Sequence, residues 1–355
     1  MAPRRFLLLV TIGCLAVLAL AALARHSVPA GFFPADYGIW RAKLDMVGHC
    51  DLAPTVVLGD SRVVAGINPR WTGMQVSNLA LTGGSTVEVY GMARQLFACS
   101  RKPKRIVVSL IFNHFMNDQL FWPYAASFGL FDRHDLEALR RQSRRLGDPV
   151  LFPTAKGLDR NGLDKDGLDL GGRLLVQEYG LHFPTSYVAN LIEGAVMRRF
   201  SSNCALEAQT LSSNGYVPIA VGPGFGGISR DVLMPQFRPT PILDHYFRAF
   251  LELAQANGTK VVFINTPLNK ASFARLTPAV QAGFAGYLGG LAADYPNFTV
   301  SMPLFQQWPD ADFGDEEMHL NPAGARRFSG MLAGLLKRAN VGDPAPAAAI
   351  PATTP

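Results

Sequence analysis

Two short segments carry residues whose types could perform nucleophilic chemistry. Ser61 lies two residues after a short apolar run that ends in Gly59, and His319 lies far downstream, one residue after a run of three acidic residues. A serine hydroxyl is a weak nucleophile until a neighbouring base takes its proton, and a histidine oriented by a carboxylate can serve as that base. The two segments together predict a serine-dependent acyl-transfer site.

Ser61 is expected at the rim of a buried sheet. The run Val56-Val57-Leu58 is apolar and β-branched, and a run of this kind bounded by a turn residue is typical of a buried strand. Ligands of open α/β sheets bind at such strand ends. Ser61 could instead only cap the next helix. We favour the nucleophile because His319 completes the set.

Strand-like and helix-like segments alternate along most of the chain. Strands are expected at Thr55–Leu58, Met74–Ser77, Arg105–Ile111, Lys260–Asn265 and Phe298–Ser301. Helices are expected at Gly38–Val47, Thr86–Phe97, Asp135–Leu146, Pro241–Ala256, Pro278–Ala293 and Pro322–Arg338. This alternation predicts an α/β fold with a parallel sheet covered by helices on both faces.

Four blocks of the chain resemble the SGNH (GDSL-like) hydrolase superfamily. The blocks are Gly59-Asp60-Ser61, then Asn78 with Gly83 and Gly84, then Asn113, then His319, in the family's order. The chain is most similar to the membrane-anchored, exported branch, whose members work beside polysaccharide O-acetylation machinery. The resemblance covers about 50–120 and 240–338. It implies a flavodoxin-like three-layer sandwich, the SGNH hydrolase fold, with 120–235 as an insertion or cap that bears on substrate choice.

The resemblance implies that Ser61 is the nucleophile and His319 the general base. The family's last block reads Asp-x-x-His, which places the orienting carboxylate three residues before the histidine. That position is Glu316 here, whereas Asp315 has the family's residue type one position too early. We expect Glu316 to orient the imidazole, with Asp315 as the alternative.

The same resemblance implies three donors to a developing oxyanion. They are the backbone N–H of Ser61, the backbone N–H of Gly84 or Gly83, and the side chain of Asn113. Glycine suits this task because its backbone can approach a ligand closely. The family's third block reads Gly-x-Asn, but Ile111 stands in place of the glycine here. This departure leaves open a rebuilt oxyanion hole.

Further polar residues near these blocks are candidates for substrate binding. Arg62 could bind a carboxylate or sugar acid, although a pairing with Asp60 is the simpler interpretation. Asp60 is expected to bind N–H groups of the turn. Asn78 and His114 are the other candidates, and His114 fits a surface position equally well.

The N-terminus carries a segment long enough to span a membrane. Phe6–Ala24 is an apolar run of 19 residues preceded by Arg4 and Arg5. Positive residues before such a run hold the N-terminus in the cytoplasm and send the rest outward. We expect an inner-membrane anchor and a periplasmic body; the alternative is a signal peptide cleaved near Ala22–Ala24, which would release a secreted protein.

The expected organisation follows from these segments. It comprises an anchor or signal at 1–25, a linker at 26–50, an SGNH-like domain at 51–340 with the insertion at about 120–235, and a disordered tail at 341–355.

The cysteines predict one disulfide bond. Cys50 precedes the first strand and Cys99 precedes the strand that begins at Arg105, so neighbouring strands would bring both to one edge of the sheet. An exported protein meets an oxidising compartment, where disulfides persist. We expect a Cys50–Cys99 bond; free thiols are the alternative.

Charge and motifs argue against several partners. The net charge is +6, but no nucleic-acid motif or interleaved aromatic residues accompany the basic clusters. An Asp-rich pseudo-repeat at 157–171 fails the EF-hand pattern, and no Cys/His cluster has metal-ligand spacing. We therefore expect no metal, no cofactor and no nucleic acid.

The resemblance and the expected location imply acyl transfer to an exported polysaccharide. The favoured hypothesis is an O-acyltransferase, with O-acetyl as the group and a multi-span membrane acyltransferase as its partner. The same residues would serve a carbohydrate esterase or deacetylase. A member of a secretion complex that binds glycan or acts as a scaffold without catalysis is the third hypothesis.

Overall fold

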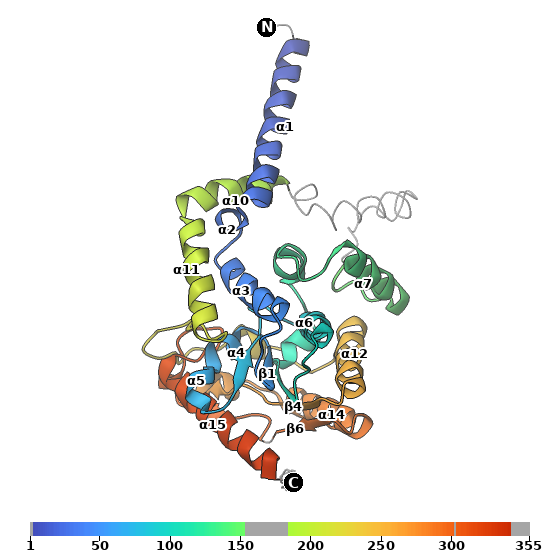
Figure 1. Cartoon of the computed structure of the whole chain (residues 1–355), viewed down its shortest axis with the longest axis vertical. Helices are drawn as coiled ribbons and strands as arrows, with labels where there is room; N and C mark the ends of the chain where they lie inside the picture. The colour runs from blue at the N-terminus through green and yellow to red at the C-terminus, as the bar shows by residue number, and fades with distance from the viewer. Residues whose placement is uncertain (1–2, 153–183, 302, 342–355) are drawn as a thin grey trace.

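Five parallel strands form the central sheet of the computed structural model, which describes residues 3–152, 184–301 and 303–341 (Figure 1). The strands are β1 (Thr55–Gly59), β2 (Val76–Asn78), β3 (Arg105–Ser109), β4 (Lys260–Phe263) and β6 (Phe298–Val300). Their order is β2-β1-β3-β4-β6, that of flavodoxin-like doubly wound sheets. Because every pair is parallel, all the carboxyl ends lie at one edge.

The five expected strands are confirmed, and the central ones are buried on both faces. Every residue of β1 and β3 is buried, as is usual for strands of a parallel sheet that helices cover on both sides. Figure 1 places α6 (Thr86–Ala98), α12 (Pro241–Ala256) and α14 (Pro278–Asp294) on one side of this sheet. The opposite side holds α4 (Ser61–Gly66), α5 (Pro69–Thr72) and α15 (Pro322–Val341).

Several short elements lie between the larger ones. They are η1 (Phe112–Phe115), β5 (Leu268–Asn269), α13 (Lys270–Phe273), β7 (Gln307–Trp308) and η4 (Asp310–Asp312), with β5 and β7 forming a second, two-stranded sheet.

The N-terminal helix α1 (Pro3–Ser27) stands away from the α/β body (Figure 1). It is long and apolar enough to cross a membrane, and Ala21 is its one buried residue. At about 1.5 Å per residue, its 25 residues exceed the hydrocarbon thickness of a bilayer.

A packed neck joins α1 to the body. It contains α2 (Pro29–Phe32), α3 (Asp36–Gly48), α10 (Pro184–Val196) and α11 (Arg199–Ser212), with α11 lying along α3. Asn203 of α11 donates to the carbonyls of Ala30 and Phe33 and accepts from the N–H of Gly38. A Cβ at Gly38 would lie 2.3 Å from the carbonyl oxygen of Asn203, so only glycine permits this contact. Residues 26–50, expected as a linker, therefore hold helices that are packed in place.

The described parts of 120–235 separate into three regions. η2 (Phe121–Ala126) and α7 (Arg133–Leu146) precede the gap, and α7 contacts α12. α10 and α11 belong to the neck, and 213–235 returns to the sheet edge with η3 (Arg230–Val232). Within 120–235, only the residues near η2 and those of 213–235 line the cavity, so only these described parts fit the expected cap. The pseudo-repeat at 157–171 and the tail at 342–355 lie outside the described residues.

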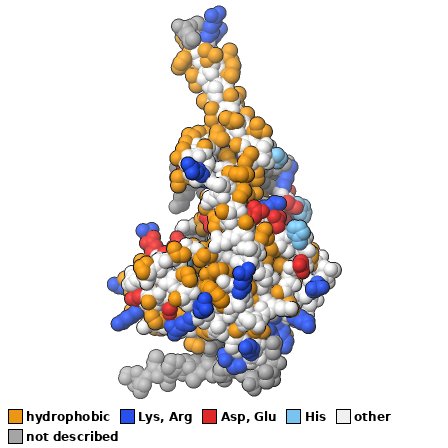
Figure 2. All heavy atoms as spheres, turned by 60° about the vertical axis from the view of Figure 1, so that its left-hand side comes forward, with side chains coloured by type: hydrophobic (Ala, Val, Ile, Leu, Met, Phe, Trp, Pro, Cys, Tyr) orange, Lys and Arg blue, Asp and Glu red, His pale blue; other side chains and the backbone are white. Residues whose placement is uncertain are grey.

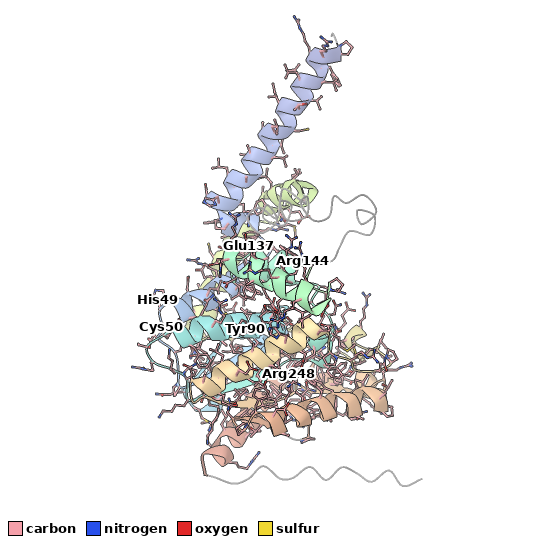
Figure 3. All side chains as sticks on the ribbon, turned by 90° about the vertical axis from the view of Figure 1, so that its right-hand side faces the viewer. His49, Cys50, Tyr90, Glu137, Arg144 and Arg248 are labelled. Carbon is pink, nitrogen blue, oxygen red and sulfur yellow. A yellow bond between two sulfur atoms is a disulfide. The ribbon has the colours of Figure 1, made fainter. Side chains whose placement is uncertain are left out.

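The expected disulfide is confirmed. Cys50 and Cys99 are bonded with an S–S distance of 2.11 Å, and the bond joins the residues that follow α3 and α6. Figure 3 shows Cys50 with His49 at this end of α3. Cys14 and Cys204 are exposed free thiols.

Candidate functional site

Local geometry at the end of β1 places Ser61 at the carboxyl edge of the sheet. Gly59 has φ +150°, and a Cβ there would lie 2.0 Å from the Ser109 carbonyl oxygen, so glycine is required where β1 passes β3. Asp60 then caps α4 by accepting the N–H of Arg62 at 3.0 Å. Ser61 is the first residue of this helix, and it lines a cavity of about 940 Å³.

His319 meets Ser61 across the mouth of this cavity. Its Nε2 lies 2.8 Å from Ser61 Oγ, and its Nδ1 lies 2.7 Å from Asp315 Oδ2. The imidazole is 3% exposed. Because an ionised carboxylate only accepts hydrogen bonds, Nδ1 carries the proton and Nε2 is left to accept from the Ser61 hydroxyl. This chain of bonds can activate a serine nucleophile.

Asp315, and not Glu316, orients His319, so the expectation for Glu316 was wrong. Asp315 Oδ1 accepts the N–H groups of Glu317 and His319, which closes a turn around Met318, at φ +64°. This turn returns the carboxylate of Asp315 to Nδ1 despite the offset of four residues. Glu316 is exposed on the cavity wall.

The pKa of Asp315 lies below its usual value. Burial raises this pKa, but the hydrogen bond and charge of His319 and the backbone N–H groups lower it by more. The carboxylate therefore stays ionised to lower pH than an ordinary aspartate, which is the state that stabilises an imidazolium.

Two backbone N–H groups near Ser61 make no hydrogen bond within the described part of the chain. One belongs to Ser61 itself, at the first position of α4, and the other to Gly83, which has φ +69° and lines the cavity. Gly84 instead donates to the Leu81 carbonyl at 3.0 Å and packs against β1. The structure therefore favours Gly83 over Gly84 as an oxyanion donor.

Asp231 was not found from the sequence, yet it organises the far wall of the cavity. It accepts from Asn113 Nδ2 at 3.2 Å and from Arg62 Nη2 at 2.7 Å. Asn113 also lines the cavity, and its amide nitrogen has a second N–H besides the one that Asp231 accepts. The expected Arg62–Asp60 pairing is replaced by Arg62–Asp231, and the arginine is only 3% exposed.

Asp60 fixes the turn beneath Ser61, as expected. Its Oδ2 accepts the N–H of Ile111 and lies 3.3 Å from His114 Nδ1, so β1 and the segment after β3 are tied together. Burial lowers the pKa of His114, but the adjacent Asp60 raises it by more, and the net pKa is above the usual value. His114 lines the cavity as a partner of Asp60.

Asn78 is structural, so its assignment to substrate binding was wrong. It is fully buried, and its Nδ2 donates to the carbonyls of Val63 and Ile67 at 2.9 Å each. Its Oδ1 accepts the N–H of Ala80. The side chain thereby joins α4, which carries Ser61, to the loop that carries Gly83.

Helix α3 holds the Gly83 loop from the other side. Trp40 Nε1 donates to the carbonyl and hydroxyl oxygens of Thr82 at 3.1 and 3.0 Å, and Lys43 Nζ donates to the Ala80 carbonyl. Lys43 is fully buried, and burial holds its pKa well below the usual value. These two side chains lie in the stretch expected as a linker, so no local sequence signal assigned them to the site.

Two buried carboxyls and one serine join the Gly83 loop to the segment after η1. Ser85 Oγ lies 2.6 Å from Glu88 Oε2 and 2.7 Å from Asp118 Oδ2. Burial raises the pKa of both carboxyls, and the charge of Glu88 adds to the rise at Asp118, which lies well above its usual value. The pair therefore shares a proton where isolated carboxyls would be ionised.

Replacing Asp118 with asparagine is expected to flatten the pH dependence of stability. A carboxyl with a raised folded-state pKa stabilises the fold fully below its unfolded pKa, near 4, and loses this contribution as pH rises through the folded value. The amide keeps the hydrogen bonds and removes one of the two titrating groups. The free energy of urea unfolding should fall less from pH 5 to pH 8 in D118N than in the wild type. D51N, at an exposed carboxyl, is the control; equal slopes for D118N and wild type would contradict the shared proton.

One group of potential metal ligands lies outside the cavity. Ligand atoms of Asp132, His134 and Asp135 are all within 4.8 Å of one another among the described residues. Asp132 caps α7 and Asp135 pairs with Arg94, so structural roles account for both carboxylates. We assign no metal to this group.

Comparisons with family models, with curated proteins and with solved structures found no match to this chain.

Proposed function

We propose that this protein is an SGNH-type serine acyltransferase that esterifies an exported polysaccharide, with O-acetyl as the transferred group. The observation that carries the proposal is the hydrogen-bonded series Ser61–His319–Asp315 at the carboxyl edge of a doubly wound sheet. Two backbone N–H groups beside it have no partner among the residues that the structure describes. The order of blocks along the sequence and the strand order support the same superfamily.

Each residue has a defined step in the proposed reaction. Ser61 Oγ attacks the acyl carbonyl while His319 Nε2 takes its proton, and Asp315 stabilises the imidazolium. The N–H groups of Ser61 and Gly83 donate to the oxyanion, with Asn113 as the side-chain donor. His319 returns the proton to the leaving group, which departs and leaves an acyl-serine. An acceptor hydroxyl, deprotonated by His319, then takes the acyl group and frees Ser61.

The carboxylates beside His319 favour a neutral sugar as acceptor over a sugar acid. Arg62 pairs with Asp231 through Nη2, and Glu316, Glu317 and Arg230 are exposed on the cavity wall. Glu317 Oε2 lies 3.9 Å from His319 Nε2, at the place where an acceptor would approach. A carboxylate on the acceptor would be repelled there. The hypothesis that Arg62 recognises a sugar acid is not part of the proposal.

Location supports transfer on the outer side of the inner membrane. Arg4 and Arg5 lie in the first turn of α1, ahead of its apolar run of spanning length, so the body would face the periplasm. The Cys50–Cys99 bond fits an oxidising compartment. An acyl donor supplied across the membrane by a multi-span partner would meet the enzyme there.

Hydrolysis is the second candidate, because water can replace the sugar hydroxyl at the same site. The cavity that Ser61 lines also carries the exposed Glu316 and Glu317 on its wall, and such a polar wall favours access by water. A scaffold without catalysis is less favoured, since it would not need the hydrogen bonds that join Ser61, His319 and Asp315.

Covalent labelling tests the acyl-enzyme step directly. An alkyl fluorophosphonate should label the wild type once per chain, and S61A should not react. S229A removes another serine hydroxyl of the same cavity wall and should label like the wild type. An unlabelled wild type, or label retained in S61A, would rule out the proposal. Loss of acetyl esters from the glycan on gene deletion would then favour the transferase, whereas an increase would favour the esterase.

A further inference from the structure

Helix α10, the short turn after it and the first turn of α11 carry large apolar side chains that the described residues leave uncovered. Ile192, Val196, Met197 and Phe200 are each more than half exposed. Ile192 and Val196 lie four residues apart and so share one face of α10. Scattered apolar residues are normal on a soluble surface, but a contiguous group marks a surface that contacts something apolar.

This apolar group lies at the root of α1. α1 packs against α10 and α2, and its one buried residue is Ala21, so the contact falls in the last turns of its apolar run. Figures 1 and 3 both show α10 beside the lower end of α1, and in Figure 1 it runs across the direction of α1. Figure 2 shows apolar side chains continuing from α1 onto the neck.

The position of α10 is fixed by close contacts. A Cβ at Gly194 would lie 2.1 Å from the Gly31 carbonyl oxygen, so α10 rests directly on the backbone of α2. Arg199 donates to the Phe32 carbonyl and to Asn190 Oδ1, each at 2.9 Å, and pairs with Glu193. The exposed face of α10 therefore cannot turn inward to bury its apolar residues.

We propose that α10 and the start of α11 lie in the membrane–water interface on the periplasmic side of the membrane that α1 crosses. Ile192, Val196, Met197 and Phe200 would then lie among the lipids. The inference requires that α1 crosses the bilayer; it does not depend on the reaction at Ser61. The last apolar turns of a spanning helix end at the interface, and a helix held across it at that level lies in the plane where amphipathic helices bind. The exposed Arg198 adds a charge that suits anionic headgroups.

This seating would fix the height and tilt of the cavity over the membrane. α11 lies along α3, and Trp40 and Lys43 of α3 hold the loop that carries Gly83. A single spanning helix could rotate and tilt freely, whereas a second apolar face in the interface removes these motions. The cavity would then face a partner in the same membrane at a constant angle.

Depth-dependent quenching in the full chain tests the seating. V196C, in a chain with Cys14→Ser and Cys204→Ser, would carry an NBD probe in phosphatidylcholine–phosphatidylglycerol nanodiscs. Lipids with a doxyl group near the headgroup should quench this probe at least twofold more than aqueous iodide does. V221C is the matched control, since Val221 is equally exposed and apolar but lies between Ala220 and Gly222, which both approach Gly314 on the α/β body; it should show the reverse order.

The outcomes separate the inference from its premise. Iodide quenching at position 196 equal to that at 221 would overturn the seating and leave the apolar face for a protein partner. A probe on the native Cys14, in a chain with only Cys204→Ser, should be quenched by doxyl groups deep in the bilayer. If iodide reaches Cys14 as well, the anchor and the seating both fail, whereas fluorophosphonate labelling of Ser61 would be unaffected.

Discussion

Replacing Asp315 with asparagine is expected to lower kcat by about 10³–10⁴-fold, with little change in KM. The amide would donate to Nδ1 of His319, which forces the proton onto Nε2 and leaves no acceptor for the Ser61 hydroxyl. The loss would also remove the charge that stabilises the imidazolium. Hydrolysis of p-nitrophenyl acetate by purified protein measures the effect.

Glu316 supplies the matched control for this prediction. It is adjacent in sequence, carries the offset of the family motif and is exposed on the cavity wall. E316Q should keep kcat within about twofold, because surface charges away from the reacting atoms contribute little. A larger loss in E316Q than in D315N would show that the turn around Met318 rearranges in solution.

Removing the Cys50–Cys99 bond by a double serine substitution is expected to destabilise the fold by about 4 kcal/mol. The bond closes a loop with a sequence separation of 49, and chain-entropy estimates for that length give this magnitude. The midpoint of urea unfolding measures the change. The pair Cys14→Ser and Cys204→Ser removes two exposed thiols and should shift the free energy of unfolding by no more than about 0.5 kcal/mol.

Activity should fall with this destabilisation, because the bond ties α3 to α6 at their ends. α3 holds Thr82 through Trp40, and α6 begins at the Ser85 cap on the same loop. An unchanged unfolding midpoint after reduction with dithiothreitol would contradict a stabilising role for the bond.

The sheet and its helices were predictable because their signals are local. β1 and β3 are short β-branched runs buried on both faces, and α12 begins at a proline and ends just before Asn257-Gly258, as its sequence predicts. Ser61 and His319 were found for a related reason, since each lies in a short motif beside such an element.

The details of the site depended on contacts that no local pattern records. The choice of Asp315 over Glu316 follows from the left-handed backbone of Met318, and the choice of Gly83 over Gly84 from one hydrogen bond to Leu81. Asp231 reaches Arg62 across 169 residues. Sequence reasoning could name the candidates here, but only the fold could rank them.

The hydrogen bonds from α3 to the Gly83 loop limit where this protein can be truncated. Trp40 and Lys43 lie between α1 and the first strand, in the stretch that a truncation made to remove the apolar helix would also remove. A fragment that begins at residue 51 would keep Ser61 and His319. It would lose Trp40 and Lys43, the buried side chains that hold the loop carrying Gly83. The neck helix α3 is therefore part of the support of the candidate site, and a useful truncation has to start ahead of Asp36.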